Sequence, residues 1–393
     1  MRKLFRRLFC IAIALLGLSV AASGQSEPFI THDTKPVITH GPYLLAPTET
    51  SITIVWMTDT PCHSKIRYGV NNELTHEVEV ARHGLLPVGT RHAATITGLK
   101  PGQTYQYRVV STRVVKLKAY WPEKGLAIES PVYSFTTFDR RKPAVSFSLV
   151  TDTHEDVARI NALMKLTDWK TTDFLVHTGD AFHWIESEDQ LFSKWLDPIS
   201  QALAQTKPLI FARGNHDLRG PFARELFDYT PTPEGRFYYA RDHGPVHLLV
   251  IDTGEDKPDD TNVYARLNRL ASYREEEFAW FQRHVETDKR LAAAPFRIIV
   301  MHQPHWGWVN DQNAKWTELA NKAKVDLVIA GHRHRFSRVK PGERGNDFPI
   351  LVVGQDQVAR VDASSSELKV VVTAKDGSVV DSFTVPAKSI NQQ

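Results

Sequence analysis

Alternating apolar and polar positions predict β-strands in the first third of the chain. Residues 51–59 (SITIVWMTD) and 104–111 (TYQYRVVS) place their side chains alternately on the two faces of an extended strand. Between these runs, Pro101-Gly102 supplies a turn. Short strands separated by turn residues are typical of a β-sandwich of about 100 residues. We therefore predict an all-β domain at residues 35–138.

A different pattern begins after DRRKP (139–143), a polar segment that ends in proline and that we take as the domain boundary. Apolar runs of strand length then alternate with segments of helical periodicity. The strand-like runs cover residues 145–150, 174–177, 208–212, 246–252, 296–302 and 325–331, and the helix-like segments cover residues 157–169, 188–205 and 274–286. In the last segment Phe278, Phe281 and Val285 recur at helical spacing, which predicts a helix with a core-facing side and a solvated charged side. Residues 365–385 have the pattern of a hairpin that turns at Asp376-Gly377. Together these elements predict an α/β domain at residues 144–388, with a β-sheet core flanked by helices.

The first 24 residues have the pattern of a secretory signal peptide. A basic start precedes the apolar run 8–20 and the small residues AASGQS. The apolar run is shorter than the ~20 residues that a comfortable membrane span needs. An uncleaved N-terminal anchor is the alternative that this pattern leaves open. We expect residues 1–24 to be removed, the mature protein to be secreted or periplasmic, and no membrane span to remain after cleavage.

Composition and charge narrow the class of protein further. The chain is 42% hydrophobic and 24% charged, which is typical of folded domains rather than of disorder. Its formal net charge of +3 is too small to indicate a stable nucleic-acid partner. Of the two cysteines, Cys10 lies in the predicted signal peptide, so Cys62 would have no intrachain disulfide partner. Nothing in the pattern indicates an oligomeric state.

Side chains that bind metals follow most of the predicted strands in the second domain. In open α/β sheets the residues at the carboxyl ends of the strands converge at one edge. The candidate metal ligands are Asp152, His154, Asp180, Asn215, His302, His332 and His334. Carboxylate, imidazole and amide oxygen suit first-row divalent or trivalent ions, and no thiolate is present to favour a structural zinc. These ligands are too many for one tetrahedral ion, but they suit two ions if one carboxylate bridges them.

The ligand motifs D-x-H, G-D, G-N-H-D, H and G-H-x-H follow one another in this order over residues 144–360. The series resembles the signature of the calcineurin-like metallophosphoesterases, which implies a β-sandwich core for the second domain. Motif by motif, the resemblance implies one ion held by Asp152, His154 and His334, a second ion held by Asn215, His302 and His332, and Asp180 between them. The ions would be iron, zinc or manganese, because these share oxygen and nitrogen ligands.

The resemblance also implies a reaction, the hydrolysis of a phosphoric ester without a phosphoenzyme. A hydroxide that bridges the two ions would attack phosphorus, and the ions would neutralise charge on the phosphoryl oxygens. His216, next to Asn215, would contact the phosphate and protonate the leaving oxygen. The implied partner is a small phosphorylated substrate.

The first domain resembles the N-terminal, fibronectin type III-like domain of purple acid phosphatases. HGPYL (40–44) and SFTTF (134–138) bracket it as they do in that family. Two positions depart from the family's pattern. The chain has D-x-H where that family has D-x-G, and it has His183 where the family has the tyrosine that gives the purple colour. We therefore expect no purple chromophore.

His183 completes GDAFH (179–183), which resembles a form found in some metal-dependent nucleases, where this histidine contacts the phosphate. It is therefore a second candidate catalytic residue, with an ordinary pocket-lining histidine as the alternative. Three other side chains leave two interpretations open. Asp217 would orient a histidine or cap the following helix. Arg213 would reach phosphate or form a surface salt bridge. Trp306 and Trp308 would line the substrate mouth or pack in the core.

The favoured interpretation is an exported, dinuclear-metal phosphoesterase that hydrolyses phosphoric monoesters. The first alternative is a phosphodiesterase acting on nucleotides, phospholipid headgroups or wall polymers, and His183 supports it. The second is a non-catalytic surface binding protein with a vestigial hydrolase fold. The intact set of ligands argues against the second alternative, because a decayed site usually loses at least one ligand.

Overall fold

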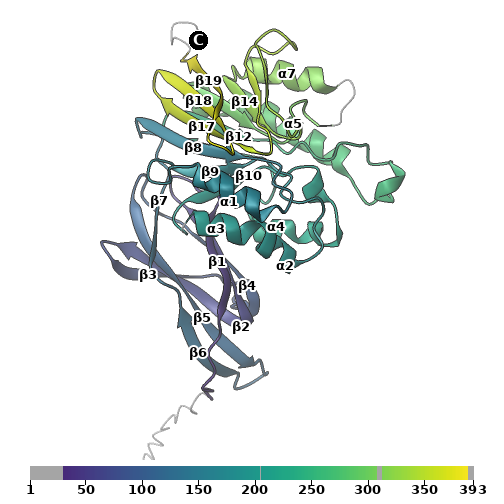
Figure 1. Cartoon of the computed structure of the whole chain (residues 1–393). Helices are drawn as coiled ribbons and strands as arrows, with labels where there is room; N and C mark the ends of the chain where they lie inside the picture. The colour runs from purple at the N-terminus through teal and green to yellow at the C-terminus, as the bar shows by residue number, and fades with distance from the viewer. Residues whose placement is uncertain (1–29, 204, 308–311, 388–393) are drawn as a thin grey trace, which may run out of the picture.

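The structure is a computed structural model that describes residues 30–203, 205–307 and 312–387 (Figure 1). The predicted signal peptide at residues 1–24 lies outside the described residues. Among the helices of the described residues, none has the length and apolar character needed to cross a membrane.

The front part of the chain is all β, as the alternation predicts. Its strands are β1 (Ile38–Leu45), β2 (Ile52–Val70), β3 (Glu73–Glu79), β4 (Gly89–Ile96), β5 (Thr104–Lys116), β6 (Glu123–Glu129) and β7 (Tyr133–Thr136). The long strand β2 is at the centre of the arrangement, since it pairs antiparallel with β1, β3, β4 and β5. Strands β6 and β7 extend the sheet through β5.

The second part of the chain is a mixed α/β fold built on two sheets. The first sheet contains β8 (Ala144–Val150), β9 (Phe174–His177), β10 (Pro208–Phe211), β17 (Gln357–Ser364), β18 (Glu367–Ala374) and β19 (Val379–Pro386), in the order β19-β18-β17-β8-β9-β10. The second contains β11 (Tyr239–His243), β12 (Val246–Val250), β13 (Phe296–Val300), β14 (Leu327–Ala330), β15 (Ser337–Val339) and β16 (Ile350–Val352), in the order β11-β12-β13-β14-β16-β15. Strands β18 and β19 form the predicted C-terminal hairpin. The predicted fold class is confirmed.

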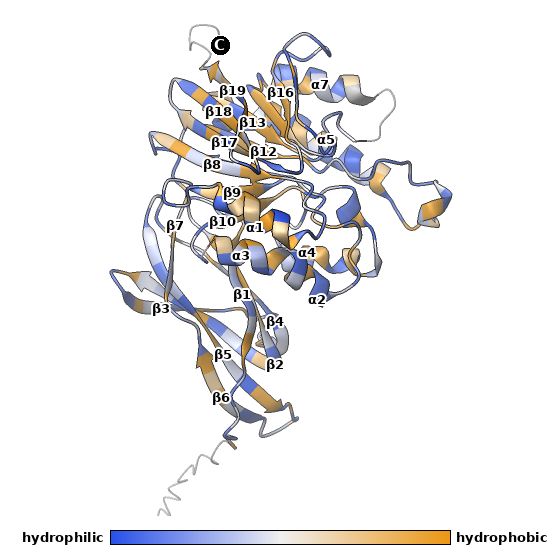
Figure 2. Ribbon diagram, viewed as in Figure 1, coloured by the Kyte–Doolittle hydropathy of each residue, from blue (hydrophilic) through white to orange (hydrophobic). Residues whose placement is uncertain are grey.

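The two sheets face each other across a fully apolar core. Phe147 and Val176 of the first sheet belong to the same buried cluster as Leu248, Ile298 and Ile329 of the second. Figure 2 shows the hydrophobic residues concentrated on these strands. Burying strands on both faces removes apolar surface from water, the main favourable term in folding. The sandwich therefore gives the strand ends a rigid frame.

Helices cover the outer faces of the sandwich (Figure 1). They are α1 (Val157–Lys165), α2 (Glu188–Leu191), α3 (Asp197–Ala202), α4 (Leu226–Tyr229), α5 (Leu270–Thr287), α6 (Lys289–Ala293) and α7 (Gln312–Lys322), with a π-helical turn η1 (Phe192–Leu196) between α2 and α3. Helices α1 and α3 pack on the first sheet, whereas α5 and α7 pack on the second. Short 3₁₀ turns lie at η2 (His216–Leu218), η3 (Pro221–Glu225) and η4 (Asn262–Tyr264).

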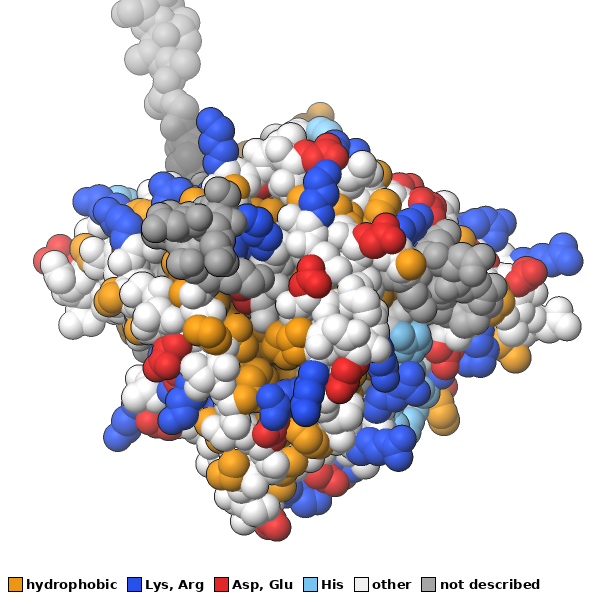
Figure 3. All heavy atoms as spheres, turned by 90° about the horizontal axis from the view of Figure 1, so that it is seen from above, with side chains coloured by type: hydrophobic (Ala, Val, Ile, Leu, Met, Phe, Trp, Pro, Cys, Tyr) orange, Lys and Arg blue, Asp and Glu red, His pale blue; other side chains and the backbone are white. Residues whose placement is uncertain are grey.

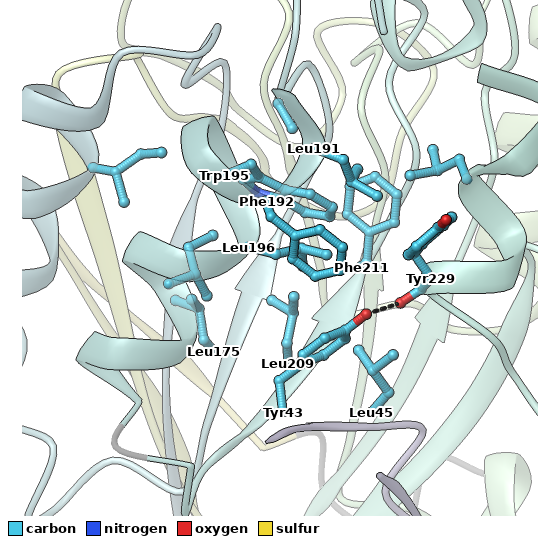
Figure 4. Packing of buried hydrophobic residues seen from close by; sticks show 14 of the residues in the cluster. Tyr43, Leu45, Leu175, Leu191, Phe192, Trp195, Leu196, Leu209, Phe211 and Tyr229 are labelled. Atoms are coloured by element: carbon cyan, nitrogen blue, oxygen red, sulfur yellow. Dashed lines mark hydrogen bonds between the residues drawn. The ribbon is translucent and has the colours of Figure 1, made fainter. Parts of the chain in front are cut away.

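The all-β part is continuous with the first sheet rather than tethered to it. Strand β1 pairs parallel with β10, with Leu44 opposite Pro208 and Leu45 opposite Leu209. The hydroxyl of Tyr43 donates a hydrogen bond to the carbonyl oxygen of Tyr229 at 2.8 Å, inside the apolar cluster shown in Figure 4. The predicted boundary at residues 139–143 thus separates two sequence patterns that share one sheet.

The two faces of β2 serve different cores. Ile54 and Trp56 pack in the front core with β4 and β5, whereas Val55 and Met57 belong to the cluster under α1 and α3. The period-2 alternation of a strand is what sends neighbouring residues to opposite faces. One strand therefore links the stability of both parts of the chain.

Helix α5 departs from its predicted pattern in one respect. Phe281 faces the core as expected, but part of the charged side, predicted to be solvated, is buried. Glu277 accepts a hydrogen bond from the backbone N–H of Asp252 at 2.7 Å, and Arg274 donates to the carbonyl oxygen of Trp306 at 2.9 Å. These two charged side chains satisfy loop backbone that water cannot reach, so this part of the prediction was wrong.

Candidate metal centre

The carboxyl ends of β8, β9, β10, β13 and β14 meet at one edge of the sandwich, and the loops that follow them carry the predicted ligands. Most of these ligands have a left-handed backbone conformation: Asp152 (φ 51°), His154 (φ 43°), Asp180 (φ 50°), His332 (φ 71°) and His334 (φ 55°). This region of φ is uncommon for residues with a side chain and is found where the surrounding structure enforces it. The loops are therefore shaped to turn these side chains toward one point.

Glycines make room for the ligand loops. A Cβ atom on Gly214 would lie 2.3 Å from Oδ1 of Asp180, and one on Gly331 would lie 1.9 Å from Oγ1 of Thr151 and 2.5 Å from Oδ2 of Asp152. Real Cβ atoms do not approach other atoms so closely, so these positions accept only glycine without a shift of the backbone. These glycines therefore let the ligand loops pack directly against one another.

One group of ligand atoms is formed by Asp152, His154, Asp180 and His334, whose candidate atoms all lie within 4.8 Å of one another. The Nε2 atoms of His154 and His334 are 3.1 Å apart. Nε2 of His334 is 3.3 Å from Oδ1 of Asp152, and Nε2 of His154 is 3.9 Å from Oδ2 of Asp180. These four side chains surround a single small volume.

A second group shares Asp180 with the first. Asp180, His302 and His332 each offer an atom within 4.8 Å of the others. Nε2 of His302 is 3.1 Å from Oδ2 of Asp180, and Nδ1 of His332 is 3.1 Å from Oδ1 of Asn215. The structure therefore brings all the predicted ligands together, with Asp180 in both groups.

The chemistry of this cluster fits metal ions. Nδ1 of His154 donates to the carbonyl oxygen of Phe182 at 3.1 Å, and Nδ1 of His302 donates to that of Thr178 at 2.7 Å. Each bond fixes the tautomer in which Nε2 presents its lone pair to the cluster. Nε2 of His302 is buried without a hydrogen bond of good geometry, which is costly unless a cation accepts that lone pair.

The protonation states of the ligands favour cation binding in part. Burial opposes the charge on His302, but Asp180 raises its pKa to about 9, and the bond to Asp152 raises the pKa of His334, so these two imidazoles release a proton when a cation binds. Burial lowers the pKa of both His154 and His332 to about 4, so these imidazoles are neutral at pH 7. Burial opposes ionisation of Asp180, yet the neighbouring His302 holds the pKa of that carboxyl below its usual value. Neutral imidazole and ionised carboxylate are the forms that bind metal ions. Together with the oxygen and nitrogen donors, this indicates a dinuclear metal site.

The two predicted catalytic histidines lie beside the ligand groups. Nδ1 of His216 donates to the carbonyl oxygen of His183 at 2.9 Å, and the backbone N–H of His216 donates to Oδ1 of Asp180 at 2.9 Å. The ring of His183 is exposed and stacks on that of His154, with centroids 4.4 Å apart. In the space-filling view from above, histidine side chains come to the surface among basic and acidic side chains (Figure 3).

Asp217 has neither of the two roles considered from the sequence. Its buried carboxylate accepts hydrogen bonds from the backbone N–H groups of Asp180 and Ala181 at 2.9 Å each, and of Gly214 at 2.8 Å. It therefore ties the loop after β9 to the loop after β10. The motif G-N-H-D gives no sign of this link, because the partners in the other loop, Asp180 and Ala181, are backbone groups that are distant in sequence.

Two other positions are now clear. Arg213 forms a buried ion pair with Asp252, with Nη2 at 2.5 Å from Oδ2, so neither a phosphate contact nor a surface salt bridge describes it. Trp306 is packed in the core, where its ring stacks on Trp316 at 5.7 Å between centroids. Trp308 lies outside the described residues.

Sequence reasoning missed one basic side chain next to His216. Arg219 places Nη1 3.1 Å from Nε2 of His216, and it makes paired hydrogen bonds to Glu255 at 2.6 and 2.8 Å. The available signal was its spacing, three residues after His216. That spacing brings the two side chains together only because η2 (His216–Leu218) is a helical turn.

Comparisons with known families and proteins agree with this geometry. Residues 146–336 match the family model described as calcineurin-like phosphoesterase. Residues 42–137 match the model described as purple acid phosphatase, N-terminal domain. Both matches fall within the parts of the chain described above.

Curated relatives are distant and longer than this chain. The probable inactive purple acid phosphatase 27 of Arabidopsis thaliana is 27% identical over 45% of this chain and 31% of its own length. Purple acid phosphatase 21 of the same plant is 22% identical over 64% of this chain and 54% of its own length. An uncharacterised protein of Mycobacterium tuberculosis is 22% identical over 71% of this chain and 56% of its own length. The chain thus spans between about a third and somewhat more than half of these relatives.

Solved structures share the fold. Purple acid phosphatase PPD1 from yellow lupin (Lupinus luteus) seeds superposes with a TM-score of 0.66 and 16% identity, over 90% of this chain and 74% of that one. The structure titled PhoD superposes with a TM-score of 0.61 and 10% identity, over 88% of this chain and 90% of that one. At these identities the likeness concerns the arrangement of the backbone.

Proposed function

We propose that this chain, which joins a purple acid phosphatase N-terminal domain to a calcineurin-like phosphoesterase domain, is an exported enzyme that hydrolyses phosphoric monoesters with two metal ions. The observation that carries the proposal is the place of Asp180 in both ligand groups. Two ions that share a carboxylate, about 3.5–4 Å apart, are the usual device for in-line displacement at phosphorus. When bound, such ions supply a nucleophilic water and neutralise charge on the phosphoryl oxygens.

The ligand groups suggest how the ions are divided. One ion would be held by Asp152, His154 and His334, the other by Asn215, His302 and His332, and Asp180 would contact both. The donors are carboxylate oxygens, imidazole nitrogens and one amide oxygen. This set suits iron, zinc and manganese alike. Metal analysis of protein purified without chelator would identify the ions.

His216 is the proposed proton donor to the leaving oxygen. Its Nδ1 donates to the carbonyl oxygen of His183, so Nε2, which lies 3.1 Å from Nη1 of Arg219, is the atom that would exchange a proton with the substrate. The backbone bond from His216 to Asp180 fixes the ring relative to the shared carboxylate. These two bonds would hold a proton donor beside a phosphoryl group bound at the ions.

A phosphodiesterase is the second candidate, and the position of His183 favours it. The exposed ring of His183 stacks on His154, so it adds an imidazole at the mouth of the site beyond His216. A diester presents one more esterified oxygen than a monoester, and a second imidazole would contact it. A vestigial, non-catalytic site has less support, since the side chains of the ligand set all lie together.

Export is proposed from the N-terminal pattern of a basic start, an apolar run and small residues. N-terminal sequencing of protein recovered from outside the cytoplasm tests it. A mature chain that begins close to residue 25 supports cleavage. Recovery only of full-length chain in the membrane fraction supports an uncleaved anchor instead.

The reaction is tested by comparing p-nitrophenyl phosphate with bis-p-nitrophenyl phosphate. Each is assayed with manganese, zinc or iron and again after chelation, beside an Asp180→Asn variant that removes the shared carboxylate. We expect faster turnover of the monoester, loss on chelation, and recovery when metal is returned. Turnover of the diester alone replaces the first candidate with the second. Failure of both substrates with every metal contradicts an enzymatic function.

A further inference from the structure

The segment between β12 and α5 forms a projection next to the candidate site (Figure 1). It is ordered at its base, because the carboxylate of Asp259 accepts the backbone N–H groups of Leu270 and Ala271 at 3.0 Å each. These are the first N–H groups of α5, which have no partner within the helix. These hydrogen bonds hold the projection against the first turn of α5.

A cavity of about 470 Å³ lies between this projection and the segment that follows His216. Arg219 forms the wall nearest the site, with Nη1 3.1 Å from Nε2 of His216. Its guanidinium is held from the other side by the paired bonds to Glu255, a buried residue of the projection. The cavity thus opens beside the atom that is proposed to protonate the leaving oxygen.

The lining of this cavity combines positive charge with apolar surface. Arg219, Arg224 and Lys257 contribute cations, and Glu255 is the carboxylate among the lining residues. Glu255 pairs with Arg219, and the adjacent Asp256 pairs with both Arg219 and Lys257. Arg224 is exposed and has no ion pair within the described part of the chain. Apolar side chains of the projection also line the cavity and are largely exposed, Val263 at 73% and Leu267 at 70%. Exposed apolar groups beside Arg224, whose charge is not paired among the described residues, and beside the exposed Lys257 suit a ligand that is both apolar and anionic.

We propose that this cavity receives the leaving group of the substrate and selects phosphoesters whose leaving group carries a second anionic group next to an apolar part. The proposal rests on the proposed function, since it names the substrate class of the same site. The chemical step is unchanged. A water gives one proton to solvent and its oxygen bonds to phosphorus, the bond from phosphorus to the leaving oxygen breaks, and that oxygen takes the proton of His216. His216 then regains a proton from solvent. Arg224 and Lys257 attract the second anion, and Val263 and Leu267 contact the apolar part.

Matched aryl phosphates test this selection. 4-Ethylphenyl phosphate has a neutral leaving group, whereas 4-(carboxymethyl)phenyl phosphate and 4-(phosphonomethyl)phenyl phosphate add a carboxylate or a phosphonate behind a methylene group. The methylene group keeps the reactivity of the three phenols similar. We expect a higher kcat/KM for both anionic esters with the metal-loaded enzyme, and a preference that weakens as salt is raised. A preference for the phosphonate alone would assign the cavity to a second phosphate rather than to a carboxylate.

Variants locate the preference in the cavity. Arg224→Gln and Lys257→Gln each lower the ratio of kcat/KM between anionic and neutral esters by about two- to fivefold, the size expected for one exposed charge pair. Arg266→Gln is the matched control, because Arg266 is exposed on the same projection but does not line the cavity. It leaves the ratio unchanged.

The outcomes separate this proposal from the proposed function. Metal-dependent turnover of the three esters at equal rates overturns the cavity assignment and leaves the phosphoesterase intact. A preference for anionic esters that neither Arg224→Gln nor Lys257→Gln reduces also overturns the assignment. If none of the esters is turned over with any metal, the proposed function fails, and the assignment falls with it.

Discussion

Asp180 is held in place by hydrogen bonds to groups outside the two ligand sets. Its Oδ1 accepts the backbone N–H of His216 at 2.9 Å, and its own N–H donates to Asp217 at 2.9 Å. Oδ2 is left facing His302 at 3.1 Å. Second contacts of this kind orient a ligand and set its affinity for the ion. Because Oδ1 accepts the backbone hydrogen bond, Oδ2 remains available to bind cations.

His216→Ala should separate proton donation from metal binding. His216 is no member of the two ligand groups that contain Asp180, so the variant should keep its metal content. Loss of a general acid lowers rates by about 10²–10⁴ on substrates with poor leaving groups. Turnover of p-nitrophenyl phosphate, whose leaving group needs little help from an acid, should fall much less. Metal analysis together with rates on alkyl and nitrophenyl esters checks this, and loss of metal would show that His216 is a ligand.

Gly331→Ala should damage the site through its backbone. The new Cβ would lie 1.9 Å from Oγ1 of Thr151 and 2.5 Å from Oδ2 of Asp152, so the loop that carries His332 must move. We expect reduced metal content and a lower Tm of the metal-loaded protein. Gly89→Ala is the control, because a Cβ atom there meets no atom within 4 Å. Equal metal content and Tm in both variants would contradict the tight packing of this turn.

The ligand side chains could be predicted from the sequence, but their supports could not. Asp152 and His334 lie in short motifs that follow apolar runs, and this pattern can be recognised from the sequence alone. Asp217 acts on the backbone of Asp180 and Arg219 on the side chain of Glu255, and only the fold brings these partners near. Their types and spacing are equally compatible with a cap or a solvated charge. Contacts between two loops produce no periodic pattern in the sequence, so they cannot be predicted from it.

At the scale of elements, strands were predicted more faithfully than the faces of helices. The apolar runs at 145–150 and 296–302 lie on β8 and β13, because buried strands need continuous apolar residues. Helix α5 differs, since Glu277 and Arg274 are charged yet buried. The spacing of hydrophobic residues cannot reveal that a charged side chain is buried because it forms hydrogen bonds with the backbone of a loop.

The start of β9 offers a test of how the strands are joined. Asp173 accepts the backbone N–H of Ser146 on β8 at 3.1 Å and forms an ion pair with Lys142. Burial opposes its ionisation, but the neighbouring His243 and Lys142 lower its pKa to about 2. Because this pKa is depressed, the carboxylate stabilises the fold above its unfolded pKa near 4, and the contribution is lost as the pH falls through 2.

Asp173→Asn should therefore lower the free energy of unfolding by up to about 2 kcal/mol at pH 7. Urea titrations of the variant and the unchanged protein at pH 7, 5 and 3 measure the difference. We expect the difference to persist at pH 5 and to shrink at pH 3. A difference that stays constant over this range would show that the charge of Asp173 contributes nothing and that only its shape matters.

At the scale of the whole molecule, the all-β part completes the first sheet. Without it, β10 would have a free edge in place of β1, and the apolar cluster around Phe192 and Trp195 would lose Tyr43 and Leu45. An exposed strand edge beside uncovered apolar surface promotes aggregation. The sequence pattern predicted two domains, but it could not predict this pairing, because parallel partners are set by topology rather than by composition.

A chain that starts at residue 139 should therefore fail to give monodisperse protein. Size-exclusion chromatography of this truncation, beside a control that removes only residues 1–29, checks the expectation. The control keeps β1 and should elute as one symmetric species. A soluble, metal-binding truncation with native mobility would show that the α/β part folds without its neighbour.

The sharing of β2 between two cores bears on how such a protein is assembled over evolutionary time. Recombination at residues 139–143, where the pattern of predicted elements changes, would pack Val55 and Met57 against helices from a different protein. The segment that recombination can exchange without loss of packing is thus larger than either of the two predicted domains. A grafted front domain should succeed only when it travels with β10 and the helices that cover β1.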